Sequence, residues 1–466
     1  MTVVAGNFCR FVRSGPCRGW VLIFLLANTL INLDYGTNPE SRFAALCAMV
    51  EDKSFRIDHY KDLTIDWSQT PDGHYYSNKA PGPVLVAYPV FWVLDKWITA
   101  GQADRAARGE ARLAHRVLSL KVLSLLFQAL PFAILVMGAL YWLQSLGASR
   151  AALHVSCVAM LFGNTAALFM NTYFGHAMAA ACVLSVCLFL IQRRYLCCGL
   201  AYGFALLADY GSALLLPGFL AAVLVAAPSK KRIEALALVC AGGLLPGLLW
   251  ILYHVSCFGT PFTLPARYQN PIFIDASRHE VLGLFRLVPD PRVLAQLLFG
   301  FQRGILWSQP WLLIVLVAGF FRPGAFVRDS ERVAGPARLL LVFLLPGMVL
   351  LLLMNASFGE WQGGSTPGPR YICAVFPAFG LLAGLVYDGL SRTMRQVTNT
   401  AVAVSTLLWM VVYSTHILVP AGQTMWGFTL RVLFEASESS LIRIGGIYLM
   451  FLWQVFRLAR KSPDVG

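Results

Sequence analysis

The sequence has few charged residues. Asp, Glu, Lys and Arg make up only 13% of its 466 residues, whereas hydrophobic residues make up 58%. Soluble domains carry about twice that charged fraction, and a water-soluble enzyme this apolar could not cover its own core. Disorder is excluded as well, because disordered chains contain few large apolar side chains. The composition predicts a polytopic membrane protein, and at about 20 residues per span the chain has room for ten or more helices.

Motifs for zinc, redox or nucleotide chemistry are also missing. The eleven cysteines include no CxxC pair or Cys/His cluster, and most lie within apolar runs, as small hydrophobic residues do. There is no GxGxxG motif and no alternation of strands and helices, which disfavours a soluble nucleotide-sugar domain. The net charge of +14 would suggest nucleic acid in a soluble protein. In a membrane protein it reflects basic cytoplasmic loops, so no nucleic-acid partner is expected.

The apolar runs predict an all-α polytopic membrane protein of about 12 transmembrane helices, forming a single domain over residues 1–466. The first run follows three arginines and has no small-residue cleavage site after it, which favours a retained signal anchor. Short loops rich in Lys and Arg put both termini in the cytoplasm. The candidate spans are 19–33, 115–143, 151–172, 176–191, 196–208, 212–227, 233–254, 303–321, 338–355, 371–390, 400–418 and 441–456.

Two long polar loops, 34–112 and 254–303, then face the extracytoplasmic side, where water-soluble substrates can reach the chain. Segment 80–100 is apolar enough to resemble another span, but it contains three prolines together with Asp95 and Lys96. We interpret it as a juxtamembrane helix lying in the interface. If it crossed the membrane, every later loop would change sides.

The first loop carries groups suited to sugar transfer at a membrane surface. Asp34 or Glu40 could serve as a general base for a hydroxyl group. Arg42 could bind a phosphate. The structural alternative is a helix start, because Asn38-Pro39-Glu40 places proline and an acid in a first turn.

Several short motifs carry a family resemblance. One span is followed by Glu40-x-Arg42-Phe43 and then by the run from Tyr76 to Gly82, YSNKAPG. This order resembles the integral-membrane glycosyltransferases of the GT-C fold, and more narrowly the protein O-mannosyltransferase and aminoarabinose transferase families. The later segments 258–262, 289–292 and 361–371 are similar to bacterial members of that group.

The resemblance implies inverting transfer of a sugar from a polyprenyl-phosphate donor to an acceptor hydroxyl at the extracytoplasmic face. Carried over, Glu40 matches the acid of the family's first motif, Arg42 its arginine, and Lys79 the lysine of its Lys-Pro-Pro motif. The family's usual first-position Asp falls on Pro39 here. Either Glu40 or Asp34 is therefore expected to act as the base.

Further residues complete the predicted site. Arg267 and Arg370 are candidates for the donor phosphate, with Arg42 and Lys79. Candidates for other substrate contacts are Asp66, His74, Tyr76, His176 and Trp361. Asp209 and Arg303 are open between functional and structural roles. No cofactor is indicated with certainty, although Asp58, Asp66 and Asp72 could bind a divalent cation.

Two other functions fit the same composition. A lipid or glycolipid transporter would be expected to show symmetric repeats and charges near the bilayer midplane, neither of which is evident in the sequence. The second function is that of a scaffold, a relative of these enzymes without catalytic activity. It stays open because Pro39 stands where the family usually has its first acid. The expected location is the inner membrane of a bacterium, among membrane lipids. The sugar and the acceptor, whether glycan, lipid or protein, are not defined by the sequence.

Overall fold

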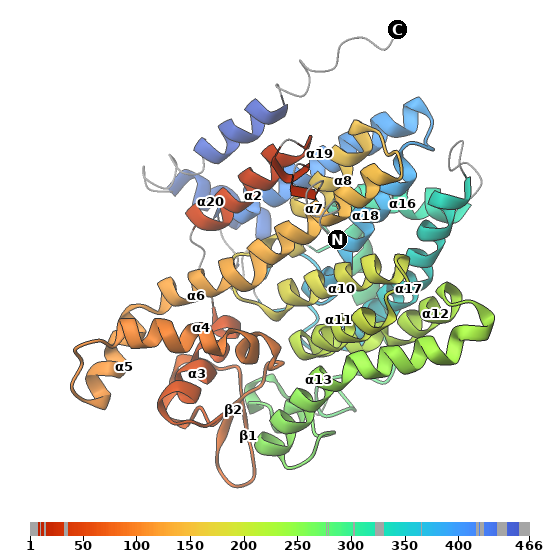
Figure 1. The fold of residues 1–466 in the computed structure, drawn as a ribbon. Coiled ribbons are helices and arrows are strands. Elements are labelled where there is room, and N and C mark those ends of the chain that lie inside the picture. The colour runs from red at the N-terminus through yellow and green to blue at the C-terminus, as the bar shows by residue number, and fades with distance from the viewer. Residues whose placement is uncertain are drawn as a thin grey trace.

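A computed structural model of the chain describes residues 8–9, 11–13, 15–31, 36–275, 277, 279–301, 303–321, 330–364, 366–415, 419, 424–435 and 445–455. Asp34, one of the two predicted bases, lies outside these residues. The described part is mainly helical (Figure 1). Each of the twelve predicted spans coincides with a helical segment.

The first half of the chain contains α2 (Arg18–Leu30), α3 (Thr37–Glu51), α4 (Gly82–Ile98), α5 (Arg105–Ala114), α6 (Arg116–Ser124), α7 (Leu130–Ser145), α8 (Arg150–Leu161), α9 (Ala166–Phe169), α10 (Gly175–Ile191), α11 (Tyr195–Ala208) and α12 (Leu216–Ala226). The second half contains α13 (Arg232–Phe258), α14 (Pro291–Phe299), α15 (Ile305–Ser308), α16 (Pro310–Phe321), α17 (Ser330–Ser357), α18 (Phe376–Tyr387), α19 (Arg392–Thr415), α20 (Met425–Glu435) and a last helix over Gly445–Val455.

Five helical stretches are long and apolar enough to cross a membrane: Arg116–Ser145, Ser229–Phe258, Val333–Ser357, Arg370–Tyr387 and Arg392–Tyr413. Shorter apolar helices account for the other predicted spans. The chain is thus a helical membrane protein, and the number of crossings stays a prediction. The largest buried cluster of apolar side chains joins α2, α7, α8, α10 and α16–α19.

One predicted span is broken. The apolar run 151–172 forms α8, which ends at Leu161, and then the single turn α9. The side chain of Asn164 donates hydrogen bonds to the carbonyls of Ala159 and Met160, 2.7 and 2.9 Å away. These bonds satisfy the last carbonyls of α8, and the helix ends there. Hydrophobicity alone could not reveal this stop.

The first loop forms a small unit of helices with a β-hairpin, a departure from a purely α-helical fold. Strand β1 (Trp67–Gln69) pairs antiparallel with β2 (Tyr75–Ser77), after the 3-10 helix η1 (Asp58–Leu63). Helix α4 occupies the predicted interfacial segment, and Trp97 on it is 65% exposed. In Figure 1 the hairpin, α3, α4 and α5 lie together at one end of the molecule.

Buried charges tie this unit together. Arg112, at the end of α5, pairs with Glu51 of α3 and with Asp95 of α4, each at 2.5 Å. The three side chains are less than 10% exposed. Removing one member of a buried pair leaves an uncompensated charge, so the network fixes α3, α4 and α5 relative to one another.

The second loop is joined to the hairpin. Ser68 of β1 forms an isolated β-bridge with Gln269, and its hydroxyl donates to the carbonyl of Pro265 at 2.8 Å. The Asn270 side chain donates to the carbonyl of Ile65 at 2.9 Å, and its backbone N–H donates to that of Trp67 at 3.1 Å. Residues on both sides of Asp66 are therefore held by a segment about 200 positions later in the chain.

Candidate functional site

Lys79 and Asp66 form an ion pair at the base of the hairpin. The Lys79 ammonium lies 2.9 Å from Asp66 Oδ1, and Thr37 at the start of α3 donates to Asp66 Oδ2, also at 2.9 Å. Burial alone would raise the pKa of Asp66, but the charge and hydrogen bonds of Lys79 and Thr37 outweigh it and leave that pKa below its ordinary value. Burial lowers the pKa of Lys79, and Asp66 opposes that change.

Arg42 is buried beside this pair. It projects from α3 and is 3% exposed, and a Cβ atom on Gly175 would lie only 2.8 Å from its guanidinium. The guanidinium donates to the backbone carbonyl of Asn38, at 3.3 Å, and to the Asn38 side chain. Its Nε has no hydrogen-bond partner among the described residues. Burial lowers the pKa of Arg42 to about 10, which leaves it charged at neutral pH.

His176 and Asp209 form a second polar pair. His176 lies in the first turn of α10, and Asp209 follows the last residue of α11. The His176 Nδ1 lies 2.6 Å from Asp209 Oδ2, while Asp209 Oδ1 accepts from the N–H of Gly211 at 3.0 Å. The histidine ring contacts that of Tyr371 edge to face, with centroids 6.1 Å apart. This pair thus connects α10 and α11 with the start of η7 (Arg370–Val375).

Arg370 completes the cluster from the far end of the sequence. Its guanidinium donates to the Tyr371 hydroxyl at 2.9 Å and lies over the Phe174 ring, 5.7 Å from the centroid. Its Nε is buried and has no partner in the described part of the chain. The preceding loop needs glycine, because Gly363 and Gly368 both have a φ of +71°, where side chains with a Cβ are strained.

Arg303 holds this loop in place. Its Nε donates to the carbonyl of Gln362 at 2.8 Å, and one Nη donates to those of Gly364 and Thr366 at 3.2 Å each. The like charges of Arg303 and Arg370 are close enough to interact electrostatically. Sequence reasoning left Arg303 undecided, because a lone arginine before a span carries no signal that it binds a loop.

Positive charge exceeds negative charge in this cluster. Arg42 and Arg370 each interact electrostatically with Asp66, with Lys79 and with His176. Within the described ranges, four cations lie in the cluster, Arg42, Lys79, Arg303 and Arg370, against the carboxylates of Asp66, Asp209 and Glu360, the last of which acts on Tyr371. Buried like charges are costly unless an anion offsets them. Two unpartnered Nε groups in the same place give the cluster free donors for anion oxygens.

Two kinds of solved structure resemble this fold. The chain is similar to ArnT from Cupriavidus metallidurans bound to undecaprenyl phosphate, with a TM-score of 0.48 and 16% identity over 97% of this chain and 76% of that one. It is also similar to the oligosaccharyltransferase AglB from Archaeoglobus fulgidus in complex with an inhibitory peptide and a dolichol-phosphate, with a TM-score of 0.47 and 12% identity over 93% of this chain and 56% of that one. The apo structure of ArnT gives a TM-score of 0.46.

These neighbours are GT-C fold glycosyltransferases, as the sequence resemblance predicted. No protein-family model matches the chain. No curated protein matches it either. Because each TM-score is below 0.5, the function proposed below rests on residues of this chain.

The other predicted base, Glu40, projects from a different side of α3. Residues two apart on a helix do not share a face, and Glu40 lies 3.2 Å from Arg116 while Arg42 faces Gly175. The predicted helix start is present as well, since α3 begins at Thr37 with Pro39 and Glu40 in its first turn. Glu40 thus has a structural partner that the sequence did not indicate.

The remaining candidates are not brought to the cluster by their contacts. His74 pairs with Asp58 at 2.8 Å on the hairpin, and Tyr76 packs on Phe258, with ring centroids 5.6 Å apart. Arg267 is exposed, and its guanidinium lies 5.9 Å from the centroid of the Tyr268 ring. Trp361 is half-buried against the main core.

The acids considered for a divalent cation have other partners. Asp58 accepts from the N–H of Tyr75 at 2.7 Å and pairs with His74, while Asp66 pairs with Lys79. Asp72 accepts a hydrogen bond from Thr70. Across the residues that the structure describes, no group of three His, Cys, Asp or Glu side chains is arranged to hold a metal ion.

Proposed function

We propose that this protein is a membrane glycosyltransferase that moves a sugar from a polyprenyl-phosphate donor to an acceptor hydroxyl at the extracytoplasmic face. One observation carries the proposal: Arg42 and Lys79 of the first loop lie close to Arg370, almost 300 positions later in the chain, and the two arginines each have an unpartnered buried Nε. Such a cluster suits a phosphate that must be bound tightly and then released from a sugar.

The chemistry needs two kinds of group. The acceptor oxygen attacks the anomeric carbon while the bond from that carbon to the phosphate oxygen breaks, which inverts the configuration. The cations stabilise the negative charge that grows on the departing lipid phosphate. A carboxylate takes the proton from the acceptor hydroxyl. A lipid-linked donor also fits a site at the edge of apolar helices.

The proposed base is an acid of the first loop, either Asp34 or Glu40. Asp66 is less suited, because its pKa is lowered and Lys79 occupies one of its oxygens. Glu40 would have to exchange Arg116 for the acceptor hydroxyl. Asp34 precedes α3 by three residues and is the other acid near the end of the first span.

The test is sugar transfer by the purified chain in lipid nanodiscs. Envelope glycans of cells with and without the gene are first compared by mass spectrometry, because a missing sugar names the donor and the acceptor. Glu40→Gln and Asp34→Asn are then assayed with that pair, and Glu110→Gln on the exposed face of α5 is the matched control. General-base catalysis contributes on the order of 10²–10⁴-fold, so one variant should lose that much activity.

Two outcomes would contradict the proposal. If both variants keep full activity, the assignment of the base is wrong. If Arg42→Gln, Lys79→Gln and Arg370→Gln, each inserted normally, all transfer the sugar at the normal rate, the cluster does not bind the donor phosphate. A chain that moves labelled lipid across the bilayer without transferring sugar would be a transporter instead.

A further inference from the structure

His176 follows directly the two residues that contact the arginines of the cationic cluster. Gly175 leaves room for Arg42, since a Cβ atom at that position would lie 2.8 Å from the guanidinium. The ring of Phe174 lies under the guanidinium of Arg370, 5.7 Å from the ring centroid. His176 itself interacts electrostatically with both arginines. A phosphate bound by the two guanidinium groups therefore lies beside the start of α10, and whatever is bonded to that phosphate comes close to His176.

The contacts of His176 leave one ring nitrogen for a ligand. Nδ1 lies 2.6 Å from Asp209 Oδ2. An ionised carboxylate can only accept hydrogen bonds, so in the neutral ring the hydrogen is on Nδ1 and Nε2 keeps its lone pair. Nε2 has no hydrogen-bond partner among the described residues, and the His176 side chain is 10% exposed. Asp209 thus orients a hydrogen-bond acceptor that still needs a donor.

The charges of the cluster limit which donor can bind. Within the part of the chain that the structure describes, the four cations of the cluster exceed its three carboxylates by one positive charge. The phosphodiester of a lipid-phosphate sugar carries one negative charge and balances this excess. An ammonium group on the sugar would restore it in a largely buried place, which is costly. The donor that fits beside the phosphate is therefore an uncharged hydroxyl group.

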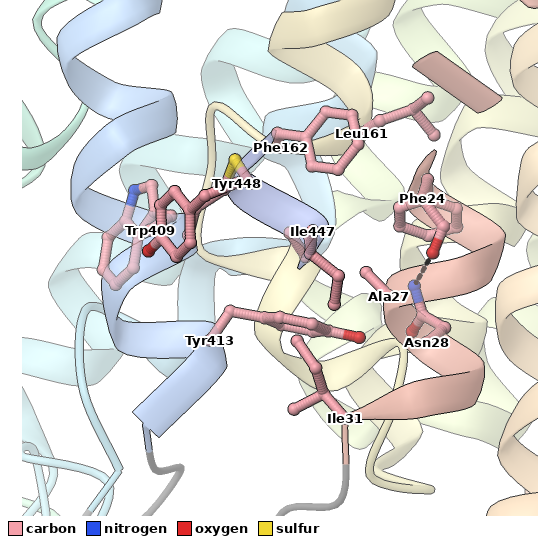
Figure 2. Close-up of a pocket in the computed structure, with 12 residues that line it drawn as sticks. Phe24, Ala27, Asn28, Ile31, Leu161, Phe162, Trp409, Tyr413, Ile447 and Tyr448 are labelled. Atoms are coloured by element: carbon pink, nitrogen blue, oxygen red, sulfur yellow. Dashed lines mark hydrogen bonds between the residues drawn. The ribbon is translucent and has the colours of Figure 1, made fainter. Parts of the chain in front are cut away.

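One pocket of the molecule is lined by none of the cluster's residues. Figure 2 shows it between Phe24 and Asn28 of α2, Tyr413 of α19 and Ile447 of the helix 445–455. Its lining contains no charged side chain, so it offers no cation to a phosphate. Because the sugar of the donor is bonded to the phosphate, the sugar lies beside the cationic cluster and not in this pocket.

We propose that His176 Nε2 accepts a hydrogen bond from the hydroxyl on the sugar carbon next to the phosphate-bearing carbon, and that the site takes an uncharged sugar rather than one with an ammonium group there. This inference rests on the proposed function, because it places the donor phosphate between Arg42 and Arg370. The hydroxyl on that carbon, C2, is the one nearest to the phosphate. Asp209 acts through His176, by keeping the hydrogen on Nδ1.

The test measures the affinity of the full chain in nanodiscs for farnesyl phosphate and for sugars linked to it, at about pH 7, where an ordinary imidazole is mostly neutral. Mannosyl and glucosyl esters, which differ only in configuration at C2, are both measured. For the sugar that binds more tightly, the 2-deoxy-2-fluoro and 2-amino-2-deoxy analogues are then compared with the parent ester. Fluorine is close to a hydroxyl in size but cannot donate a hydrogen bond.

Two differences in affinity are expected. Loss of one hydrogen bond corresponds to about a fivefold change, so the fluoro analogue should bind about fivefold less tightly than the parent ester. The amino analogue should bind at least about tenfold less tightly, because its ammonium group leaves a buried positive charge without a partner.

A matched pair of variants assigns the first difference to His176. His176→Asn keeps a side-chain N–H for Asp209 but has no group at the position of Nε2. It should bind the parent ester and the fluoro analogue equally, and farnesyl phosphate as tightly as the wild type does. His59→Asn is the control, because His59 pairs with Asp52 at 3.3 Å but is 64% exposed. This variant should keep the full preference for the hydroxyl.

Three results would overturn the proposal. They are equal binding of the parent ester and the fluoro analogue by the wild type, tighter binding of the amino analogue, and an unchanged preference in His176→Asn. Each leaves the proposed function standing as long as farnesyl phosphate binds. If farnesyl phosphate itself does not bind, the phosphate site of the proposed function fails together with this inference. The comparison of ligands on the wild type needs no variant, so it decides the matter even if His176→Asn fails to insert.

Discussion

Lys79 and Asp66 lie 2.9 Å apart with most of each side chain shielded from solvent, 19% and 11% being exposed. They are 13 positions apart in the sequence, and the hairpin brings them together. Each of these largely buried charges stabilises the other, so removing either one would destabilise the folded protein. A loss of activity in a single variant could therefore reflect folding or function, and the pair must be tested in a way that separates them.

Lys79→Gln is expected to destabilise the protein by about 3–5 kcal/mol, because it leaves the Asp66 carboxylate buried without its partner. The double variant Lys79→Gln/Asp66→Asn should regain most of that stability, since no charge is then left unpaired. Sugar transfer should stay lost in both. Thermal unfolding in detergent and the transfer assay measure the two effects. Recovery of transfer in the double variant would show that Lys79 acts only as a structural partner.

Arg370→Lys should raise the KM for the lipid-phosphate donor by about tenfold, because lysine keeps the charge but cannot make the bidentate contact of a guanidinium. Arg267→Lys is the matched control, since Arg267 is exposed and lies beside Tyr268 rather than in the cluster. Steady-state kinetics at increasing donor concentrations give the donor KM of both variants. An equal rise in KM for Arg267→Lys would place that residue in the donor site, where the sequence analysis expected it.

Gly368→Ala should damage the site more than Gly364→Ala. Both positions have a positive φ, +71° and +61°, so both alanines carry backbone strain of about 1 kcal/mol or more. Only at Gly368 would the new Cβ approach neighbours closely, within 2.6 Å of the Trp409 ring and 2.8 Å of Thr165. Such overpacking typically costs a further 1–3 kcal/mol and would displace Arg370.

The measurement for the glycine pair is unfolding temperature together with donor KM. We expect a small loss of stability and a near-normal KM for Gly364→Ala. Gly368→Ala should lose more stability and raise KM. If the two variants behave alike, the loop tolerates movement at Trp409 and does not position Arg370.

Acidification should weaken the protein through Asp66. Its pKa is lower in the folded chain than its ordinary value of 3.8, so the unfolded chain binds the proton first. The stabilisation is complete above pH 3.8 and is lost as the pH falls below that value toward the folded pKa. Unfolding temperatures of wild type and Asp66→Asn should therefore converge over the pH range below 3.8. A constant difference across that range would show that Asp66 does not titrate with folding.

The sequence predicted the helices well because membrane helices are marked by their apolar runs. Each predicted span overlaps one or more helices of the described residues, and α4 occupies the predicted interfacial segment. The break after Leu161 was missed, since it depends on Asn164 bonding back to the end of α8 rather than on hydrophobicity. The hairpin was missed because its strands are three residues each, too short for a periodic pattern.

Some of the predicted site residues lie together in the structure, and others do not. Short local motifs drew attention to three basic residues, Arg42, Lys79 and Arg370. The fold brings them close to Asp66 and His176. His74, Tyr76 and Arg267 have contacts elsewhere, because neighbours in a strand or loop point to different sides. Arg303 donates hydrogen bonds to backbone carbonyls about 60 positions later in the chain. No local sequence pattern marks such a contact, so the sequence could not predict it.

Asn270 donates hydrogen bonds to the carbonyls of Ile65 and Trp67, the residues on either side of Asp66. The position of an acid in the first loop thus depends on a residue that is synthesised after the first seven predicted spans, 19–33 to 233–254. Fragments ending before the second loop should therefore insert their helices yet lack a finished site. Chimaeras that exchange one loop between relatives should be inactive, whereas those that exchange both loops together keep the Asn270 contacts intact.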